Sequence, residues 1–188
     1  SAGAGHTCGV TTSGSVKCWG WDENGQSNHP TGTFDSVNAG WHHNCGVTTL
    51  GSVECWGDND NDQADPPLGA FNSVSGGQRH TCGVTISDTV ECWGDDGDGQ
   101  SNPPEGTFNS VSAGRRHTCG VTTSGAVECW GDDGDGQSSP TSDTFDSVSA
   151  GGRHTCGVTT SGTVECWGRD EHGQSSPPPG TFASVSAG

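Results

Sequence analysis

Cysteine is the residue type best placed to do chemistry in this chain of 188 residues. The ten cysteines fall into two series, and within each series the spacing is 37 residues. The first series is Cys8, Cys45, Cys82, Cys119 and Cys156, and the second is Cys18, Cys55, Cys92, Cys129 and Cys166. Recurring thiols of this kind form disulfides in an oxidising compartment or bind zinc.

A hairpin over the first pair of cysteines favours the disulfide. If residues 12–14 form a three-residue loop with Gly14 in the left-handed region, the register places Cys8 directly opposite Cys18. The third unit carries Asp88 where the others have Gly, and Asp tolerates a left-handed backbone. The predicted disulfides are Cys8–Cys18, Cys45–Cys55, Cys82–Cys92, Cys119–Cys129 and Cys156–Cys166.

Zinc is the competing chemistry, because a histidine stands two residues before each first-series cysteine. These histidines are His6, His43, His80, His117 and His154. Structural zinc usually takes four ligands, whereas each unit offers three, and directly opposed strand cysteines are close enough to oxidise. The histidines are therefore expected to be hydrogen-bonded strand residues, with zinc as the open alternative.

An acidic turn follows the Trp-Gly pair of each unit, and carboxylates on a turn suit Ca²⁺. The spacing of Asp58, Asp60 and Asp62 imitates the start of an EF-hand loop, but Gln63 stands where that loop needs Gly. Asp and Asn also favour turns for local reasons. The candidate calcium ligands are Asp58, Asp60, Asp62, Asp95, Asp96, Asp98, Asp132, Asp133 and Asp135.

The two positions that lie four and three residues before the first cysteine vary between units. Trp and Arg gather there, and both are enriched in binding hot spots. The candidate partner-binding residues at these positions are Trp41, His42, Arg79, Arg115, Arg116 and Arg153, and Trp21, after the first Trp-Gly pair, is a further candidate. The alternative is that they are solvated loop residues that offset an acidic surface. No unit assembles a nucleophile, a base and an orienting group, so a non-catalytic protein is expected.

The elements that position these residues are short strands in a tandem repeat. The units are approximately 1–33, 34–70, 71–107, 108–144 and 145–181, with 182–188 left to complete the first blade or that of a neighbour. A period of this size with several short strands is typical of a propeller or solenoid. The recurring Phe and Trp are expected to pack between units, and strand alternation puts Trp19 on the face opposite the cysteines.

Charge and composition exclude several classes. Six Lys and Arg oppose 23 Asp and Glu, so the net charge of −17 repels phosphate backbones and nucleic-acid binding is not expected. No apolar stretch approaches twenty residues, so no membrane span is expected. The disulfides imply export, which predicts an extracellular or cell-surface location.

The unit resembles the repeat of the regulator-of-chromosome-condensation family. The third unit shows the pattern of His, Thr, Gly, Trp-Gly and Gly-Gln at residues 77–84, 90–94 and 99–100, and the pair Asp62-Gln63 is the visible departure in the second unit. The resemblance covers nearly the whole chain and implies a β-propeller with one four-stranded blade per unit. It also implies a protein-binding platform and a paired-cysteine variant of secreted members.

These observations predict an all-β propeller of five blades, favoured as a closed ring, with part of a larger ring or an open tandem array as the alternative. The predicted function is a non-catalytic interaction or assembly module that binds a protein or glycan at the cell surface. The alternatives are a Ca²⁺-assisted lectin or adhesin, and an inhibitor of a secreted enzyme. Because residues 1–3 repeat residues 186–188, terminal strand exchange into a homo-oligomer or filament is a further expectation.

Overall fold

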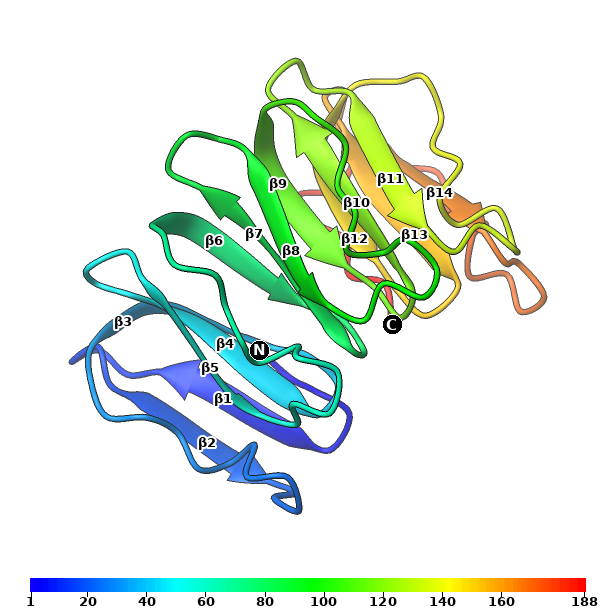
Figure 1. The fold of residues 1–188 in the computed structure, drawn as a ribbon. Helices are drawn as coiled ribbons and strands as arrows, with labels where there is room; N and C mark the ends of the chain where they lie inside the picture. The colour runs from blue at the N-terminus through cyan, green and yellow to red at the C-terminus, as the bar shows by residue number, and fades with distance from the viewer.

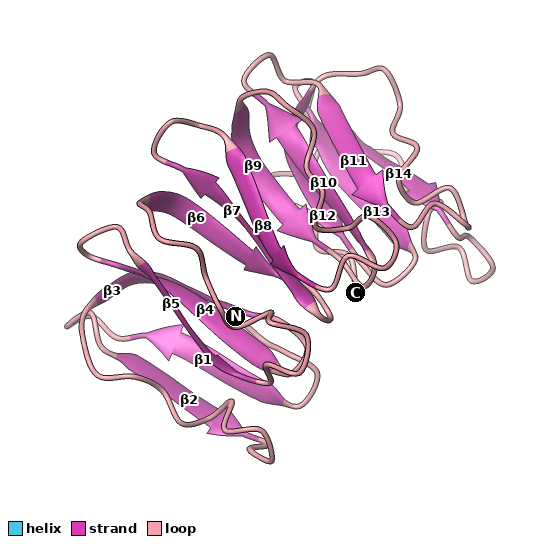
Figure 2. Cartoon of the chain, in the orientation of Figure 1, coloured by secondary structure: helices cyan, strands magenta, loops and turns pink.

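The computed structural model describes residues 1–188 as an all-β chain (Figure 2). Strands alternate with turns along its whole length, and no helix is present that could cross a membrane. The strands are β1 (His6–Val10), β2 (Val16–Gly20), β3 (Phe34–Ala39), β4 (His43–Thr48), β5 (Val53–Gly57), β6 (Phe71–Gly76), β7 (His80–Thr85), β8 (Val90–Gly94), β9 (Phe108–Ala113), β10 (His117–Thr122), β11 (Val127–Gly131), β12 (Phe145–Ala150), β13 (His154–Thr159) and β14 (Val164–Gly168).

Each repeat folds into one antiparallel sheet. The sheets are β3-β4-β5, β6-β7-β8, β9-β10-β11 and β12-β13-β14, while the first repeat supplies only the pair β1-β2. Blades of four strands were expected, and the structure has three in each complete sheet. The segment after the third strand forms turns instead: in residues 58–70, Asp62 N–H donates to the Asn59 carbonyl. Pro66 and Pro67 that follow have no N–H with which to extend a ladder.

The hairpin that carries both cysteines is confirmed in every repeat. In the first, Cys8 lies opposite Cys18, and Gly14 closes the loop with a φ of 84°. Asp88 adopts the left-handed backbone expected of it, with a φ of 64°. All five predicted disulfides are present, with Cα atoms between 4.0 and 4.2 Å apart, and no cysteine is free. A zinc site built on free thiolates is therefore wrong for this structure.

The apolar core is divided among four interfaces between successive sheets. The hairpin of one repeat packs its disulfide and valines against the Phe and Trp of the next, as Cys82 and Val84 do against Phe108 and Trp130. The two rings lie edge to face with centroids 6.1 Å apart, an arrangement that the ring quadrupoles favour. The equivalent pairs are Phe34–Trp56, Phe71–Trp93 and Phe145–Trp167. Cysteines and tryptophans thus occupy opposite faces of each sheet, as strand alternation predicts.

The sheets stand side by side in an open arc (Figure 1). Neighbouring sheets meet through β1 with β3, β4 with β6, β7 with β9 and β10 with β12, and no backbone hydrogen bond joins the first sheet to the last. Closure into a five-bladed ring was the favoured arrangement. The structure instead shows an open arc (Figure 1), which agrees with both alternatives, part of a larger ring and an open tandem array. Residues 182–188 lie against the fifth sheet, where Ala187 N–H donates to Ser149 Oγ at 3.0 Å.

Candidate binding rim around the central space

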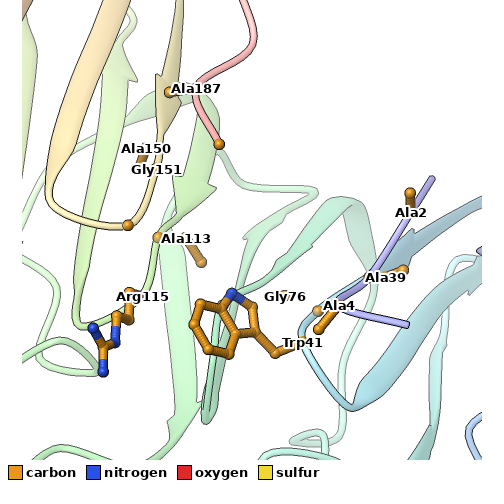
Figure 3. A pocket seen from close by; sticks show the side chains of 16 residues that line it. Ala2, Ala4, Ala39, Trp41, Gly76, Ala113, Arg115, Ala150, Gly151 and Ala187 are labelled. Carbon is orange, nitrogen blue, oxygen red and sulfur yellow. The ribbon is translucent and has the colours of Figure 1, made fainter. Parts of the chain in front are cut away.

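The five repeats together line a cavity of about 390 Å³ that is open to solvent. Its walls are mostly the small residues that end the first strand of each repeat, such as the pairs Ala39-Gly40 and Ala113-Gly114. Trp41 and Arg115 are the only large side chains that line it, and the Trp41 indole extends into the space (Figure 3). The walls therefore consist of alanine and glycine, and only Trp41 and Arg115 have side chains that could recognise a ligand specifically.

The glycines of these walls are required by the packing of the buried histidines. A Cβ at Gly40 would lie 2.4 Å from His43 Cε1 and 2.7 Å from the Gly77 carbonyl oxygen. Real Cβ atoms are not found at such distances, so a larger residue would push two neighbouring repeats apart. The recurring Ala-Gly pair thus sets how closely the repeats approach one another around the cavity.

Backbone hydrogen bonds join the loops that follow these strands. Trp41 N–H donates to the Gly77 carbonyl, and the same bond recurs from Gln78 and from Arg115 to the glycine of the next repeat, at 3.1 to 3.2 Å. The variable position of one repeat is thereby placed beside that of the next. We call the row formed by Trp41, Gln78 and Arg115 the inner arc of the rim.

Trp41 and Arg115 contact each other across the inner arc. The Arg115 guanidinium carbon lies 5.7 Å from the centroid of the Trp41 ring, and Arg115 Nε donates to Gln78 Oε1 at 3.2 Å. A cation over an indole contributes about 0.5–1 kcal/mol at an exposed site. Because Trp41 remains 38% exposed, the pair presents an ordered aromatic face and a positive charge to solvent.

The acidic turns form an outer arc beside the inner one. Arg116 Nε lies 2.5 Å from Asp98 Oδ2, and Arg153 Nη1 lies 3.5 Å from Asp135 Oδ2. Both arginine side chains stay about half exposed, so each still faces solvent. Arg79 is exposed and forms no ion pair.

Trp21 and His42 occupy the same rim at the junction of the first two repeats. Their rings lie edge to face with centroids 4.9 Å apart, and His42 also lies 6.5 Å from the Trp41 ring. The aromatic candidates therefore cluster at one end of the rim. The candidate arginines lie on the third, fourth and fifth repeats, and Arg115 reaches back to Trp41.

A cationic hollow that the sequence analysis missed lies at the fifth repeat. Its volume is about 400 Å³. The residues that line it are Arg115, Arg153, His154, Arg169, His172, Gln174 and Gly188. Arg169 and His172 stand on the turn after Trp-Gly, where the three preceding repeats carry Asp at the position of Arg169. That departure from the repeat is the signal that could have identified them.

Four of the recurring histidines are structural, and their hydrogen bonds fix the tautomer: His6, His43, His80 and His117. Thr81 Oγ1 donates to the Gln63 carbonyl at 2.9 Å, so its oxygen accepts the bond from His43 Nε2 at 2.7 Å. His43 Nδ1 is then an unprotonated acceptor, and it is buried without a partner. Burial lowers the pKa of His43 to about 4 and that of His80 to about 3. Neutral, buried rings of this kind bind neighbouring repeats together and do not serve as exposed bases.

The carboxylates of the acidic turns are engaged by the turns themselves. Asp95 Oδ1 accepts a hydrogen bond from Gly97 N–H at 3.1 Å, and Asp96 Oδ1 accepts one from Ser101 N–H at 2.9 Å. No group of three or more His, Cys, Asp or Glu side chains is arranged to hold a metal ion. The geometry therefore best supports the interpretation that these aspartates stabilise their own turns.

Solved structures of two plant receptor kinases share this fold. The chain is 30% identical to the CRINKLY WD40 ectodomain of the Arabidopsis thaliana receptor kinase ACR4, with a TM-score of 0.74 and coverage of 89% of this chain and 61% of that one. It is 28% identical to the entire ectodomain of the Physcomitrella patens receptor kinase CR4, with a TM-score of 0.82 and coverage of 98% and 54%.

Yeast RCC1 (Prp20), solved with Kap60, has the same fold at 15% identity, with a TM-score of 0.79 and coverage of 95% and 57%. The chain thus spans little more than half the length of each of these structures. No curated protein sequence matches it. The model of the regulator of chromosome condensation (RCC1) repeat matches residues 1–26, 34–63, 71–100, 108–137 and 145–174. The chain belongs to the RCC1 repeat family.

Proposed function

We propose that this chain is a non-catalytic interaction module that binds an acidic, aromatic-containing segment of a partner protein on the rim. The observation that carries the proposal is the Trp41–Arg115 pair beside the cationic hollow. Three of the five arginines line that hollow in a chain whose net charge is −17. Arg153 is paired with Asp135 and Arg169 with Glu171, so Arg115 is the arginine of the hollow that has no carboxylate partner.

The geometry suits recognition of a protein segment. Arg presents a planar fork that binds carboxylates through two parallel hydrogen bonds, and a partly exposed indole offers apolar contact at low entropic cost. The Arg115 side chain is already ordered by Trp41 and Gln78, so less conformational entropy is lost on binding. The net negative charge disfavours an extended nucleic-acid partner.

We place this module outside the cell or on its surface. Five disulfides support an oxidising compartment, and two of the structures that the chain is similar to are receptor-kinase ectodomains.

A labelled peptide of alternating Glu and Phe tests the proposal by fluorescence anisotropy. We expect binding that weakens about tenfold or more in the double variant Arg115→Glu, Arg153→Glu, because each substitution removes a positive charge and adds a negative one. The control is Lys17→Glu, which makes the charge change of one of these substitutions at an exposed position on strand β2, and it is compared with the single variant Arg115→Glu as well as with the double variant. An equal loss in the control, or no binding of the peptide by the parent chain, would overturn the proposal.

Two further probes separate a protein partner from any polyanion. A peptide of alternating Lys and Phe should not bind, since it reverses the charge and keeps the aromatic content. Single-stranded DNA should bind much more weakly than the acidic peptide. DNA binding of equal strength would assign the hollow to polyanions in general and contradict a protein partner.

A secreted enzyme is one narrower proposal for the partner. Arg116 carries it, because its guanidinium is about half exposed beside the inner arc. Capture of secreted hydrolases on the immobilised chain, lost with Arg116→Glu, would support an inhibitor. Retention of the enzyme by that variant would count against it.

A calcium-assisted lectin or adhesin is the less favoured proposal, since the aspartates already hold their own turns. Calorimetry with Ca²⁺ alone tests it. Heat of binding that disappears in Asp95→Asn, Asp96→Asn would revive this function, and glycan binding indifferent to a chelator would remove it.

A further inference from the structure

The second and third repeats carry aliphatic side chains in open contact with solvent. The chain has two leucines and one isoleucine, and none of the three is buried. Leu50 is 91% exposed, Ile86 is 68% exposed, and Leu68 is fully exposed. Single apolar side chains are common on protein surfaces, whereas several that lie together indicate a contact surface.

The three aliphatic residues lie on segments that meet at Ala70. Phe71 N–H donates to the Gly51 carbonyl at 2.8 Å, and a Cβ at Gly51 would lie 3.5 Å from the Ala70 Cβ. On the other side, Ile86 N–H donates to the Ala70 carbonyl at 3.1 Å. Figure 1 shows the turns that join β4 to β5 and β7 to β8 on the same side of the arc. We call this surface the apolar edge, and its residues are Leu50, Leu68, Ala70 and Ile86.

The same place is polar at the other junctions between repeats. Three of them have two threonine hydroxyls joined by a hydrogen bond of 2.7 to 2.9 Å. These pairs are Thr33–Thr49, Thr107–Thr123 and Thr144–Thr160. At the junction of the second and third repeats, Ala70 and Ile86 replace the pair, and the position of Leu50 is Ser in the other four repeats. The departures toward aliphatic residues are therefore gathered at one junction.

A hollow of about 270 Å³ adjoins the apolar edge at the third repeat. Thr89, in its wall, lies in the hairpin turn that holds Ile86. The residues that line the hollow are Thr89, Val90, Pro103, Pro104, Glu105 and Gly106. Two proline rings and a carboxylate suit the apolar stem and the charged head of a lysine or an arginine.

The carboxylates beside the apolar edge have no cationic partner. Asp88, in the turn with Ile86, and Glu105, in the hollow, are both exposed, and neither takes part in an ion pair. The one lysine or arginine in residues 34–107 is Arg79. Arg79 precedes β7 at the rim, and Ile86 follows the other end of that strand, about 20 Å away. The apolar edge is therefore aliphatic and locally negative.

We infer that the apolar edge and the hollow beside it bind a basic segment of a partner protein that carries a run of aliphatic side chains. The aliphatic run covers Leu68 and Ile86, and a lysine or arginine of the segment enters the hollow and reaches Glu105. Burial of aliphatic surface supplies affinity, and the unpaired carboxylates select for positive charge. This surface lies at the opposite end of the strands from the rim and prefers the opposite charge.

Charge complementarity favours a basic partner over two other occupants. A second copy of this chain has a net charge of −17 and would bring the same negative edge, so the two copies repel each other. A membrane surface of anionic lipids is repelled for the same reason. A basic protein segment is attracted by the charges that disfavour both.

A labelled peptide of four leucines flanked on each side by two lysines tests the inference by fluorescence anisotropy. We expect saturable binding that weakens about tenfold or more in the variant Leu50→Ser, Leu68→Thr, Ala70→Thr, Ile86→Thr, because it removes the aliphatic surface. Each new residue stands at the matching position of another repeat, so the variant should fold, and thermal melting verifies this.

The matched control makes the reverse change at another junction. Thr144→Ala, Thr160→Ile places the same aliphatic pair between the fourth and fifth repeats and leaves the apolar edge intact, so binding should be unchanged. The alternating Lys and Phe peptide is a second control. It has positive charges but no aliphatic run, so it should bind at least about tenfold more weakly.

Two charge variants separate this surface from the rim. Asp88→Asn, Glu105→Gln keeps the shape of the edge and removes its charge, so binding should weaken about threefold or more and become less dependent on salt. The rim variant Arg115→Glu, Arg153→Glu should bind this peptide at least as tightly as the parent chain. Failure of the rim proposal and failure of this one are therefore distinguishable.

No binding by the parent chain, or equal binding by the variant that lacks the aliphatic surface, would overturn the inference. Sedimentation velocity and flotation with neutral phosphatidylcholine vesicles examine the other occupants. Self-association that this variant loses would assign the edge to a second copy. Vesicle binding that it loses would assign the edge to a membrane, and either result would overturn a basic protein partner.

Discussion

Trp93 and Trp19 occupy the same position in their repeats but differ in burial. Trp93 is 8% exposed and donates its indole N–H to the Gln63 carbonyl, whereas Trp19 is 58% exposed and makes no such bond. Their hairpins have the same register and the same disulfide. The difference teaches that the hairpin is a local product of its sequence, while the burial of the tryptophan depends on the preceding repeat.

The largest expected difference between the interior of the arc and its ends is in how stability depends on pH. The buried His43, His80 and His117 have pKa values of about 4, 3 and 4, against an ordinary value of 6.5, because burial disfavours the charged ring. Between pH 6.5 and pH 4 these histidines bind more protons in the unfolded chain than in the folded one. The free energy of unfolding therefore falls as the pH drops from 6.5 toward 4. The expected loss is about 3 kcal/mol for each buried histidine at pH 4.

Chemical denaturation at pH 7 and pH 4 measures this loss. His80→Gln keeps a donor for Thr118 and removes the titration, so its stability should depend less on pH than that of the parent chain. His154→Gln is the control, since His154 is only half-buried at the open end. Equal effects of the two substitutions would contradict the assignment.

Truncation of the two tryptophans should lower the free energy of unfolding much more at the interior position than at the end of the arc. Trp93→Ala removes a buried ring that packs on Cys45 and Val53, and we expect a loss of about 3–5 kcal/mol in the free energy of unfolding. Trp19→Ala should cost the monomer less than about 0.5 kcal/mol. Urea denaturation at low protein concentration measures both, and a comparable loss at the two sites would show that the first sheet is covered.

Adding one methyl group gives a smaller and more local test. The Cβ of Gly120→Ala would lie 2.7 Å from Phe108 Cδ1, so we expect a loss of about 1–3 kcal/mol from overpacking. Gly9→Ala meets no atom within 4 Å and should be neutral or slightly stabilising. Thermal melting of the two variants compares them directly. A destabilising Gly9→Ala would show that the space beside β1 is occupied.

The smallest effect is expected within a hairpin loop. Asp88 holds a left-handed backbone that costs a non-Gly residue about 1 kcal/mol, and Asp88→Gly relieves that strain while making the unfolded chain more flexible. We therefore expect a change of no more than about 0.5 kcal/mol in either direction. Gly125→Asp, the reverse change in the fourth repeat, should be similarly mild. A large loss in either variant would indicate that the loop has contacts beyond its own turn.

Which residues of the rim lie close together could be determined only from the tertiary structure. Trp41 and Arg115 stand two repeats apart, yet a contact of 5.7 Å joins them. The sequence identified both as variable residues without showing that they meet. The sequence alone does not place Arg169 and His172 in a cationic hollow, because the hollow depends on how the fifth repeat lies against the fourth.

The sequence by itself determined the features that depend on the hairpin within each repeat. Turn residues, strand alternation and the loop length between paired cysteines fix the hairpin register, the disulfides and the left-handed Asp88, since these rest on local backbone geometry. Only the tertiary structure decided the open arc and the residues that the rim brings together. Those features depend on the angle between packed sheets, which many small contacts set together and no short segment encodes.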